Sequence, residues 1–151
     1  GREMSMTLSD SFCVDRYRGE FLDLMRSGTI DIVFANKQEV LALYETDDFD
    51  AALTAIAADC RLAAVTMSED GAVILSGGER IHVPAFPVET VVDTTGAGDL
   101  FAAGFLFGYT QGRTLAESGR LGCLAASIVI AQIGPRPMDS LKKAAEKIGL
   151  L

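Results

Sequence analysis

The sequence predicts an α/β fold, in which helices are layered on a mostly parallel sheet that carries an antiparallel hairpin at its edge. Three observations lead to this prediction. Short apolar runs alternate with helical patterns through the first half of the chain. Two strand-like runs, Ala72–Leu75 and Arg80–Val83, then flank Ser76-Gly77-Gly78-Glu79, which has the composition of a hairpin turn. The remainder, from residue 100 onward, is helical in pattern.

In the first half of the chain, the spacing of apolar residues switches between a period of two, which predicts a strand, and a period of about 3.6, which predicts a helix. Met4, Met6 and Leu8 alternate with polar residues and predict a strand, whereas Asp10 precedes a helical pattern that stops at Gly28. The elements expected here are a strand at residues 3–8, a helix from Ser11 to Ser27, a strand at Ile30–Phe34, a helix from Asn36 through Tyr44, a helix from Phe49 to near Cys60 and a strand at Leu62–Met67.

A further strand and a helix flank the glycine-rich segment that follows the hairpin. Val88–Val92 is an apolar run that predicts a strand leading straight into this segment. Leu100 begins a helix that we expect to end by Gly112. Because residues 100–107 are apolar on every side, we expect this helix to be largely buried.

Two more helices complete the chain. Thr114, with Glu117 three residues later, predicts a capping box that opens a helix running to about Gln132. Gly134-Pro135 supplies the stop signal for this helix, since glycine and proline commonly follow a helix C-terminus. Asp139 is expected to cap the last helix.

The composition and charge of the chain narrow its class. Its 151 residues are 49% hydrophobic and 23% charged, which is typical of a folded globular protein. The formal net charge of −8 has the wrong sign for following a phosphate backbone, so neither nucleic acid nor an anionic membrane is an expected partner. No apolar run reaches the roughly eighteen residues of a membrane-spanning helix, and we expect a cytoplasmic protein.

The cysteines and the single histidine form no recognisable metal or catalytic pattern. Cys13, Cys60 and Cys123 are odd in number and widely separated, without the spacing of a zinc site. Free thiols in a reducing compartment are therefore expected. His82 stands alone on a predicted hairpin strand, which favours a partly exposed structural residue over a metal ligand.

The most informative segment is Asp93-Thr94-Thr95-Gly96-Ala97-Gly98-Asp99, which joins a predicted strand to a helix N-terminus. Free N–H groups at a helix start and the positive end of the helix dipole form an anion site. Gly96 and Gly98 lack Cβ atoms, so the backbone can bend there and a phosphate can approach closely. Asp99 places a carboxylate beside this site, where it can accept a proton from a hydroxyl group. Donors and base together favour phosphoryl transfer.

Other glycine-rich phosphate sites have requirements that this segment does not meet. A Walker A loop needs a lysine after its second glycine, and no lysine lies between Lys37 and Lys142. A dinucleotide-binding fingerprint needs a third small residue where Phe101 stands. The remaining alternative is an ordinary strand-to-helix turn with Asp99 as a helix-dipole partner, although the two threonines, two glycines and two aspartates exceed what a cap needs.

The segment and the apolar helix after it resemble the second signature of the ribokinase-like (PfkB) carbohydrate and nucleoside kinases. Two other motifs match this family in the same order along the chain. Asn36-x-x-Glu39 follows a predicted strand, and Val65–Gly71 resembles the family's nucleotide-site loop. The resemblance spans nearly the whole chain and implies a ribokinase-like layered fold.

Within the family, the sequence looks most like adenosine kinases and the bacterial sugar kinases grouped with them, at Thr7–Asp10, Arg120-x-Gly122 and Ala125–Ile130. Family members bind the sugar or nucleoside mainly through an N-terminal half with a glycine-rich motif and a small β lid, and this sequence contains neither. The resemblance thus implies that residues 1–151 are the C-terminal nucleotide-binding and catalytic-base portion of such a kinase, without the substrate and lid portion. Alone, this portion is expected to be inactive.

The resemblance also implies roles for individual residues. Asp99 matches the catalytic base, which deprotonates the acceptor hydroxyl, and Gly96, Ala97 and Gly98 match the anion hole. Ser68 stands where the family usually has glycine. The nucleotide is expected to contact five further residues, namely Thr66, Ser68 and Gly71 in the loop, and Gly122 and Cys123 near the adenine end.

Metal ions are implied at two places. In the family, Asn36 and Glu39 act near Mg²⁺ and the phosphates largely through water, since magnesium keeps much of its hydration shell. Spacing alone also allows another interpretation, in which Asn36 caps a helix and Glu39 is its capping-box partner. Asp93 and Thr95 match positions around the monovalent-cation site, for K⁺, that some members use.

The predicted function is ATP-dependent phosphoryl transfer from MgATP to a hydroxyl group of a sugar or a nucleoside such as adenosine. The alternative is a non-catalytic nucleotide-binding or regulatory module with the same fold. A third interpretation is an unrelated α/β interaction domain. An incomplete kinase would expose a sheet edge and apolar surface, which favours association, so a homodimer is a further expectation.

Overall fold

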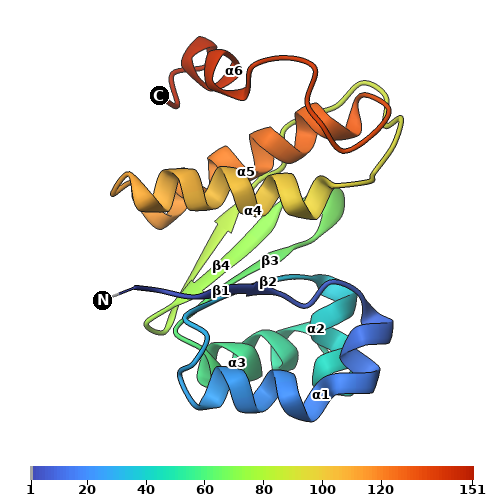
Figure 1. The fold of residues 1–151 in the computed structure, drawn as a ribbon, viewed down its shortest axis with the longest axis vertical. Helices are drawn as coiled ribbons and strands as arrows, with labels where there is room; N and C mark the ends of the chain where they lie inside the picture. Colours follow the sequence, from blue (N-terminus) through green and yellow to red (C-terminus); the bar gives the residue numbers. More distant parts are fainter. Residues whose placement is uncertain (1) are drawn as a thin grey trace. The chain divides into compact units, whose positions relative to one another are not determined.

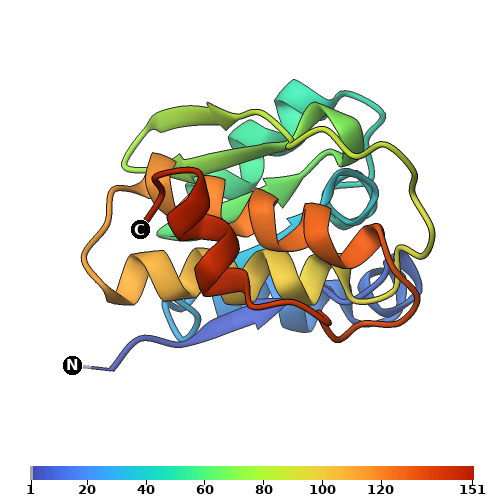
Figure 2. The same ribbon diagram turned by 90° about the horizontal axis from the view of Figure 1, so that it is seen from above.

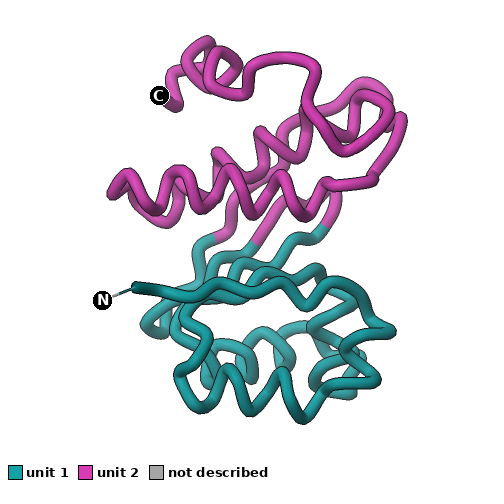
Figure 3. The backbone as a smooth tube through the Cα atoms, in the orientation of Figure 1, with its two compact units in different colours: residues 1–67, 73–81 teal, residues 68–72, 82–151 magenta. Residues whose placement is uncertain are grey.

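The computed structural model describes residues 2–151, which divide into two compact units (Figure 3). Unit 1 comprises the chain up to Met67 together with Val73–Ile81, and unit 2 comprises Ser68–Ala72 and His82–Leu151. The chain crosses from one unit to the other after residues 67, 72 and 81. No single linker separates the units, which explains why the composition gives no sign of the division.

The sheet has five strands in the order β1-β2-β3-β4-β5. Strand β1 pairs with β2, and β2 with β3, in parallel. The two residues Gly77 and Gly78 join β4 to β5, both with positive φ, and so short a connection forces an antiparallel hairpin. The expected mixed, mostly parallel sheet is confirmed. The strands are β1 (Ser5–Thr7), β2 (Ile32–Asn36), β3 (Leu62–Thr66), β4 (Ala72–Ser76) and β5 (Glu79–Val83).

Three helices of unit 1 cover one face of its strands (Figure 1). They are α1 (Ser11–Arg26), α2 (Lys37–Leu43) and α3 (Phe49–Asp59). Each begins on a side chain that accepts a hydrogen bond from the first turn. Asp10 accepts from the amide of Cys13, and Asp48 from the amide of Ala51. These caps satisfy amides that the helix itself cannot pair.

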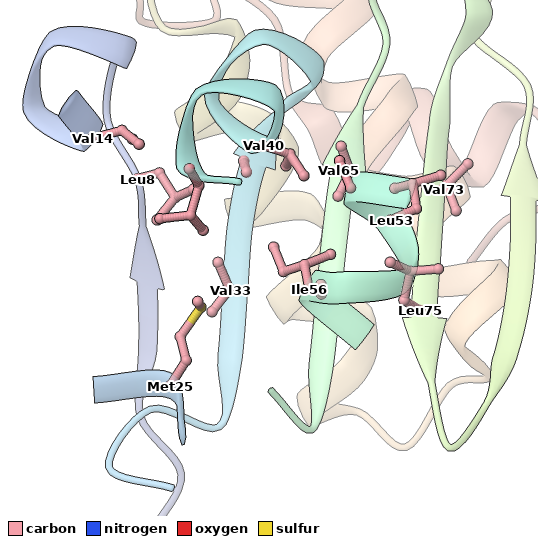
Figure 4. Packing of buried hydrophobic residues seen from close by; sticks show 14 of the residues in the cluster. Leu8, Val14, Met25, Val33, Val40, Leu53, Ile56, Val65, Val73 and Leu75 are labelled. Carbon is pink, nitrogen blue, oxygen red and sulfur yellow. The ribbon is translucent and has the colours of Figure 1, made fainter. Parts of the chain in front are cut away.

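The core of unit 1 fills the space between these helices and the sheet (Figure 4). Alternate residues of a strand point to the same face, so Val33, Val65 and Leu75 meet side chains such as Val40 and Ile56 from the helices. The intervening strand residues are buried as well, as is typical of strands inside a parallel sheet. These are Ile32, Phe34, Leu62, Ala64 and Ile74.

Unit 2 is built on two helices that run side by side, α4 (Ala97–Thr110) and α5 (Leu115–Ile130), with α6 (Leu141–Lys147) following them (Figure 2). Glycines allow the close approach of α4 and α5. A Cβ atom on Gly104 would lie 2.5 Å from the Leu121 carbonyl oxygen, and one on Gly122 would lie 2.8 Å from the Phe101 carbonyl oxygen. A 3₁₀ turn at Ser68–Asp70 also belongs to this unit.

The predicted capping box of α5 is confirmed. The Glu117 carboxylate accepts from the Thr114 amide (2.9 Å), and the Thr114 hydroxyl accepts from the Glu117 amide (3.2 Å). The predicted cap of α6 is wrong by one residue. Ser140, not Asp139, accepts from the Lys143 amide (3.3 Å), because the helix begins one residue later than expected.

The predicted strand at Val88–Val92 is wrong. The Val92 amide donates to the Ile130 carbonyl at the end of α5 (2.8 Å), not to a neighbouring strand. A strand is stable only beside another strand, and Pro87, just before the run, has no amide to contribute. Val91 and Val92 are consequently exposed.

The expectation that the helix after Leu100 is largely buried is also wrong. One face of α4 is buried, with Phe101 and Phe105 almost inaccessible, whereas Phe107 is 46% exposed. The contact with α5 lies on one side of α4. Apolar side chains on the opposite side, such as Phe107, therefore stay exposed. Within residues 2–151, no helix combines the length and the apolar character needed to cross a membrane.

Candidate active site

The turn before α4 carries the residues that the sequence singles out. Gly96 is the N-cap of α4 and has a left-handed backbone (φ +80°), which glycine adopts without strain. A Cβ atom on Gly96 would also lie 2.5 Å from the Cβ of Pro135. A Cβ atom on Gly98, by contrast, would meet no atom within 4 Å. Packing therefore requires glycine at the first position and leaves open space beside the second.

The first turn of α4 presents backbone amides without acceptors. No side chain caps this helix, and the amides of Gly98 and Asp99 find no acceptor in the described part of the chain. Ala97 differs from the expectation, because its amide already donates to the Thr94 carbonyl (3.1 Å). Free amides at the N-terminus of a 14-residue helix, together with the helix dipole, can bind an anion.

Asp99 lies in the same helical turn as these donors. Its side chain is exposed and has no hydrogen bond or ion pair with the residues described here, so the carboxylate is available to an incoming group. One residue thus supplies both a free amide and a carboxylate. An anion held by the amides and a hydroxyl group that loses its proton to the carboxylate can meet at this turn.

Asp93 is engaged in holding the turn together. Its carboxylate accepts from the Thr95 amide and from the Gly134 amide, each at 2.9 Å. The Thr95 hydroxyl and these two amides hold the pKa of Asp93 below its usual value. The Asp93 carboxylate therefore joins the turn before α4 to the loop after α5. Both of its oxygens have protein donors, and a role in cation binding stays a prediction.

In unit 1, the structure brings Asn36, Glu39 and Thr66 together. Asn36 and Thr66 are paired neighbours at the carboxyl ends of β2 and β3, and the Thr66 hydroxyl donates to the Ala35 carbonyl (3.4 Å). Asn36 caps α2, and its amide and side-chain nitrogen donate to the two oxygens of Glu39 (2.9 and 2.8 Å). The capping-box interpretation of this motif is thus confirmed as geometry.

Glu39 is a buried carboxylate, only 5% exposed. Burial raises its pKa above the usual value, and the hydrogen bond from Asn36 opposes that rise. A direct metal cage is not formed here, because residues 2–151 contain no group of three His, Cys, Asp or Glu side chains able to hold an ion. Both oxygens of Glu39 have protein donors, and a role of this pair near Mg²⁺ through water stays a prediction.

The loop between β3 and β4 has two left-handed residues. Ser68 has φ +53° and Gly71 has φ +86°, and the Gly71 amide donates to the Ser68 carbonyl (3.1 Å). A Cβ atom on Gly71 would overlap the Val83 carbonyl and lie 2.6 Å from the Ala85 amide. The backbone of Ser68 costs about 1 kcal/mol relative to glycine, which explains the glycine usual in the family.

Gly122 and Cys123 lie in the middle of α5. Gly122 has a packing role, because any side chain there would collide with the Phe101 carbonyl on α4. Cys123 is buried, and burial raises the pKa of its thiol to about 11, as expected for a structural cysteine. The three cysteines are free thiols, and His82 is exposed on β5, as predicted.

The predicted site residues are divided between the two units. Asn36, Glu39 and Thr66 belong to unit 1, and all the others belong to unit 2. Sequence reasoning missed the loop after α5, which contributes Gly134 and Pro135 to the turn before α4. Its only sequence signal was Gly134-Pro135, which also marks an ordinary helix stop.

Comparisons with known proteins give the family and the fold of this chain. The sequence profile of the pfkB family carbohydrate kinases matches residues 6–142. A probable sugar kinase from Rhizobium etli CFN 42 is 74% identical with a TM-score of 0.99, over 100% of this chain and 46% of that chain. An adenosine kinase from Sinorhizobium meliloti is 69% identical with a TM-score of 0.97, over 98% of this chain and 45% of that chain.

A more distant structure is a ribokinase from Arabidopsis thaliana complexed with ribose and ATP. It is 28% identical with a TM-score of 0.73, over 83% of this chain and 42% of that chain. The chain likewise spans about half the length of the curated relatives it matches, 48% and 45% of two that are each 38% identical to it. The match covers most of this chain, and the chain belongs to the pfkB family of carbohydrate kinases.

Proposed function

We propose that this chain is the nucleotide-binding and catalytic-base portion of a kinase that transfers the γ-phosphoryl group of ATP to a hydroxyl group of a sugar or nucleoside. The observation that carries the proposal is the uncapped start of α4, where the free amides of Gly98 and Asp99 lie beside the exposed Asp99 carboxylate. The ribokinase complexed with ATP and the adenosine kinase support it through their similarity to this chain.

Asp99 acts as the general base, and the amides of α4 hold the charge of the group in transfer. The acceptor hydroxyl loses its proton to the Asp99 carboxylate as its oxygen forms the bond to phosphorus, and ADP leaves with the bridging oxygen. A general base contributes about 10² to 10⁴ in rate, and a preorganised donor about 3 to 4 kcal/mol of barrier lowering. The amides therefore matter at least as much as the base.

The remaining predicted residues receive supporting roles in this proposal. Thr66, Ser68 and Gly71 contact the nucleotide, with Gly122 and Cys123 toward the adenine end. Asn36 and Glu39 hold water molecules of the Mg²⁺ ion that accompanies ATP, which supplies charge neutralisation on the phosphates when bound. Any dependence on K⁺ is assigned to Asp93 and Thr95.

Adenosine is the acceptor to test first, because the adenosine kinase from Sinorhizobium meliloti is 69% identical to this chain. Residues 1–151 would replace the matching 45% of that enzyme, and the chimera would be assayed for ATP-dependent phosphorylation of adenosine. We expect activity within about tenfold of the parent, since the reacting groups are retained. The 151-residue chain by itself should bind MgATP in a calorimetric titration without forming product.

Two outcomes would contradict the proposal. A chimera that folds, binds MgATP and phosphorylates neither adenosine nor ribose would favour the non-catalytic nucleotide-binding module. A chain that binds no MgATP at all would favour an interaction domain unconnected with phosphates. The melting temperature of the chimera, compared with that of the parent, separates either result from misfolding.

A further inference from the structure

One side chain within the loop after α5, that of Gln132, makes two hydrogen bonds to the loop's own backbone. The Gln132 side-chain nitrogen donates to the Arg136 carbonyl, and its oxygen accepts from the Met138 amide (3.0 Å). Hydrophobic packing does little for this loop, because Ile133 is 84% exposed and Met138 is 82% exposed. The loop, residues 132–138, is therefore shaped by the two polar contacts of Gln132.

This loop contacts the turn before α4 at two points. The Gly134 amide donates to the Asp93 carboxylate (2.9 Å), and Pro135 lies so close to Gly96 that a Cβ atom there would approach it to 2.5 Å. The other oxygen of Asp93 accepts from the Thr95 amide. The loop thus contacts Asp93 and Gly96, which precede and follow Thr95 in the sequence. Both come shortly before the free amides of Gly98 and Asp99.

These contacts hold the residues just before the first turn of helix α4. Its N-cap, Gly96, has no side chain, and no other side chain accepts from its first amides in residues 2–151. Glycine is also the residue with the most conformational freedom, so its left-handed conformation must be held by its neighbours. The neighbours that hold it are Asp93 and Pro135, and the loop that carries Pro135 is held by Gln132.

We propose that Gln132 is a positioning residue for the anion site of α4. It acts through the loop 132–138, Pro135 and Asp93 on the orientation of the Gly98 and Asp99 amides. The inference rests on the proposed function, because it assumes that these amides bind the terminal phosphoryl group of ATP. ADP lacks that group, so loosening the amides weakens the binding of ATP more than that of ADP.

The test compares Gln132→Met with Gln111→Met in the 151-residue chain. Methionine keeps the length of the side chain and removes both hydrogen bonds of Gln132. Gln111 is an exposed glutamine at the C-terminal end of α4, and its replacement controls for the change of residue type. Calorimetry with MgATP and MgADP gives two dissociation constants, and amide chemical shifts report on Gly98 and Asp99 without any ligand.

We expect Gln132→Met to weaken ATP binding roughly three- to tenfold and ADP binding less than about twofold, with shifted resonances at Gly98 and Asp99. Gln111→Met should leave all three measurements unchanged. Equal weakening of both nucleotides, or unshifted Gly98 and Asp99 resonances, would overturn the role of Gln132. If the unmodified chain binds no ATP, the proposed function fails, whereas the resonance shifts still decide whether Gln132 positions these amides.

Discussion

Five helices of residues 2–151 begin on a side chain that accepts a hydrogen bond from their first turn, whereas α4 begins on Gly96 without one. The capped helices satisfy their amides locally with Asp10, Asn36, Asp48, Thr114 and Ser140. Glycine at an N-cap costs only a few tenths of a kcal/mol relative to these residues, so α4 can leave its first amides unpaired at little cost in stability. The contrast between α4 and the capped helices therefore separates amides paired within their own helix from amides that we propose for a ligand.

Asp99→Asn gives the largest effect expected at the uncapped start. In the adenosine kinase chimera, asparagine keeps the size of the side chain and loses the basic carboxylate, so turnover should fall about a hundredfold or more. MgATP affinity should stay nearly constant, because the amides are unchanged. Steady-state kinetics and calorimetry measure the two quantities.

Asp139→Asn is the matched control for this substitution. Asp139 is exposed and, within residues 2–151, caps no helix, so its turnover should equal that of the unmodified chimera. Undiminished turnover in Asp99→Asn would remove the carboxylate from its proposed role. An equal loss of turnover in the Asp139→Asn control would show that replacing an exposed carboxylate by an amide lowers activity wherever it is made.

Gly98→Ala should weaken ATP binding and stabilise the fold at the same time. The added Cβ meets no atom of a neighbouring segment within 4 Å, and alanine favours a helix by about 0.5 to 1 kcal/mol, so the melting temperature should rise by about 1 to 4 °C. The methyl group occupies the space through which a phosphate approaches the amides. We expect an ATP affinity about tenfold lower, measured by calorimetry.

Gly19→Ala supplies the comparison within a capped helix. Gly19 lies in α1 and also has no atom within 4 Å of an added Cβ, so the same gain in melting temperature is expected without any change in ATP affinity. Stabilisation by both substitutions with unaltered ATP binding in Gly98→Ala would mean that the space beside Gly98 holds no phosphate.

Acid should release the loop after α5 only at low pH. The pKa of Asp93 is lowered in the folded chain, so the contribution of its carboxylate to stability is present above the unfolded pKa and is lost as pH falls through the folded pKa. The amide resonance of Gly134 should therefore stay constant from neutral pH to about 4 and move below that. Movement near pH 6 would contradict this assignment.

The sequence predicts the capped helices well because their signals are local. Thr114 and Glu117 are three residues apart, and a capping box needs nothing beyond those two residues and their own helix. The same holds for the hairpin at Gly77-Gly78, whose two residues determine the turn. The motif of Asp93–Asp99 is likewise continuous, so the residues that we propose for the anion site and its base are visible in the sequence.

What the sequence cannot predict depends on contacts between distant segments. The run Val88–Val92 has strand composition, but composition does not supply a neighbouring strand. The burial of α4 is determined by the elements that pack on it, α5 above all, and not by its own apolar residues. The contact of Pro135 with Gly96 joins residues 39 positions apart, and no periodicity in the chain indicates it.

Asp48→Ala tests the capped side of the comparison and has the smallest expected effect. The Asp48 carboxylate accepts from the Ala51 amide (3.1 Å) at an exposed helix start, so its loss should cost about 1 kcal/mol of unfolding free energy. Urea unfolding measures that loss. ATP affinity should not change, because the Ala51 amide is paired within its own helix and has no role in the proposed nucleotide site. A change in ATP affinity as large as that of Gly98→Ala would mean that nucleotide binding follows global stability and that the uncapped start of α4 has no special role.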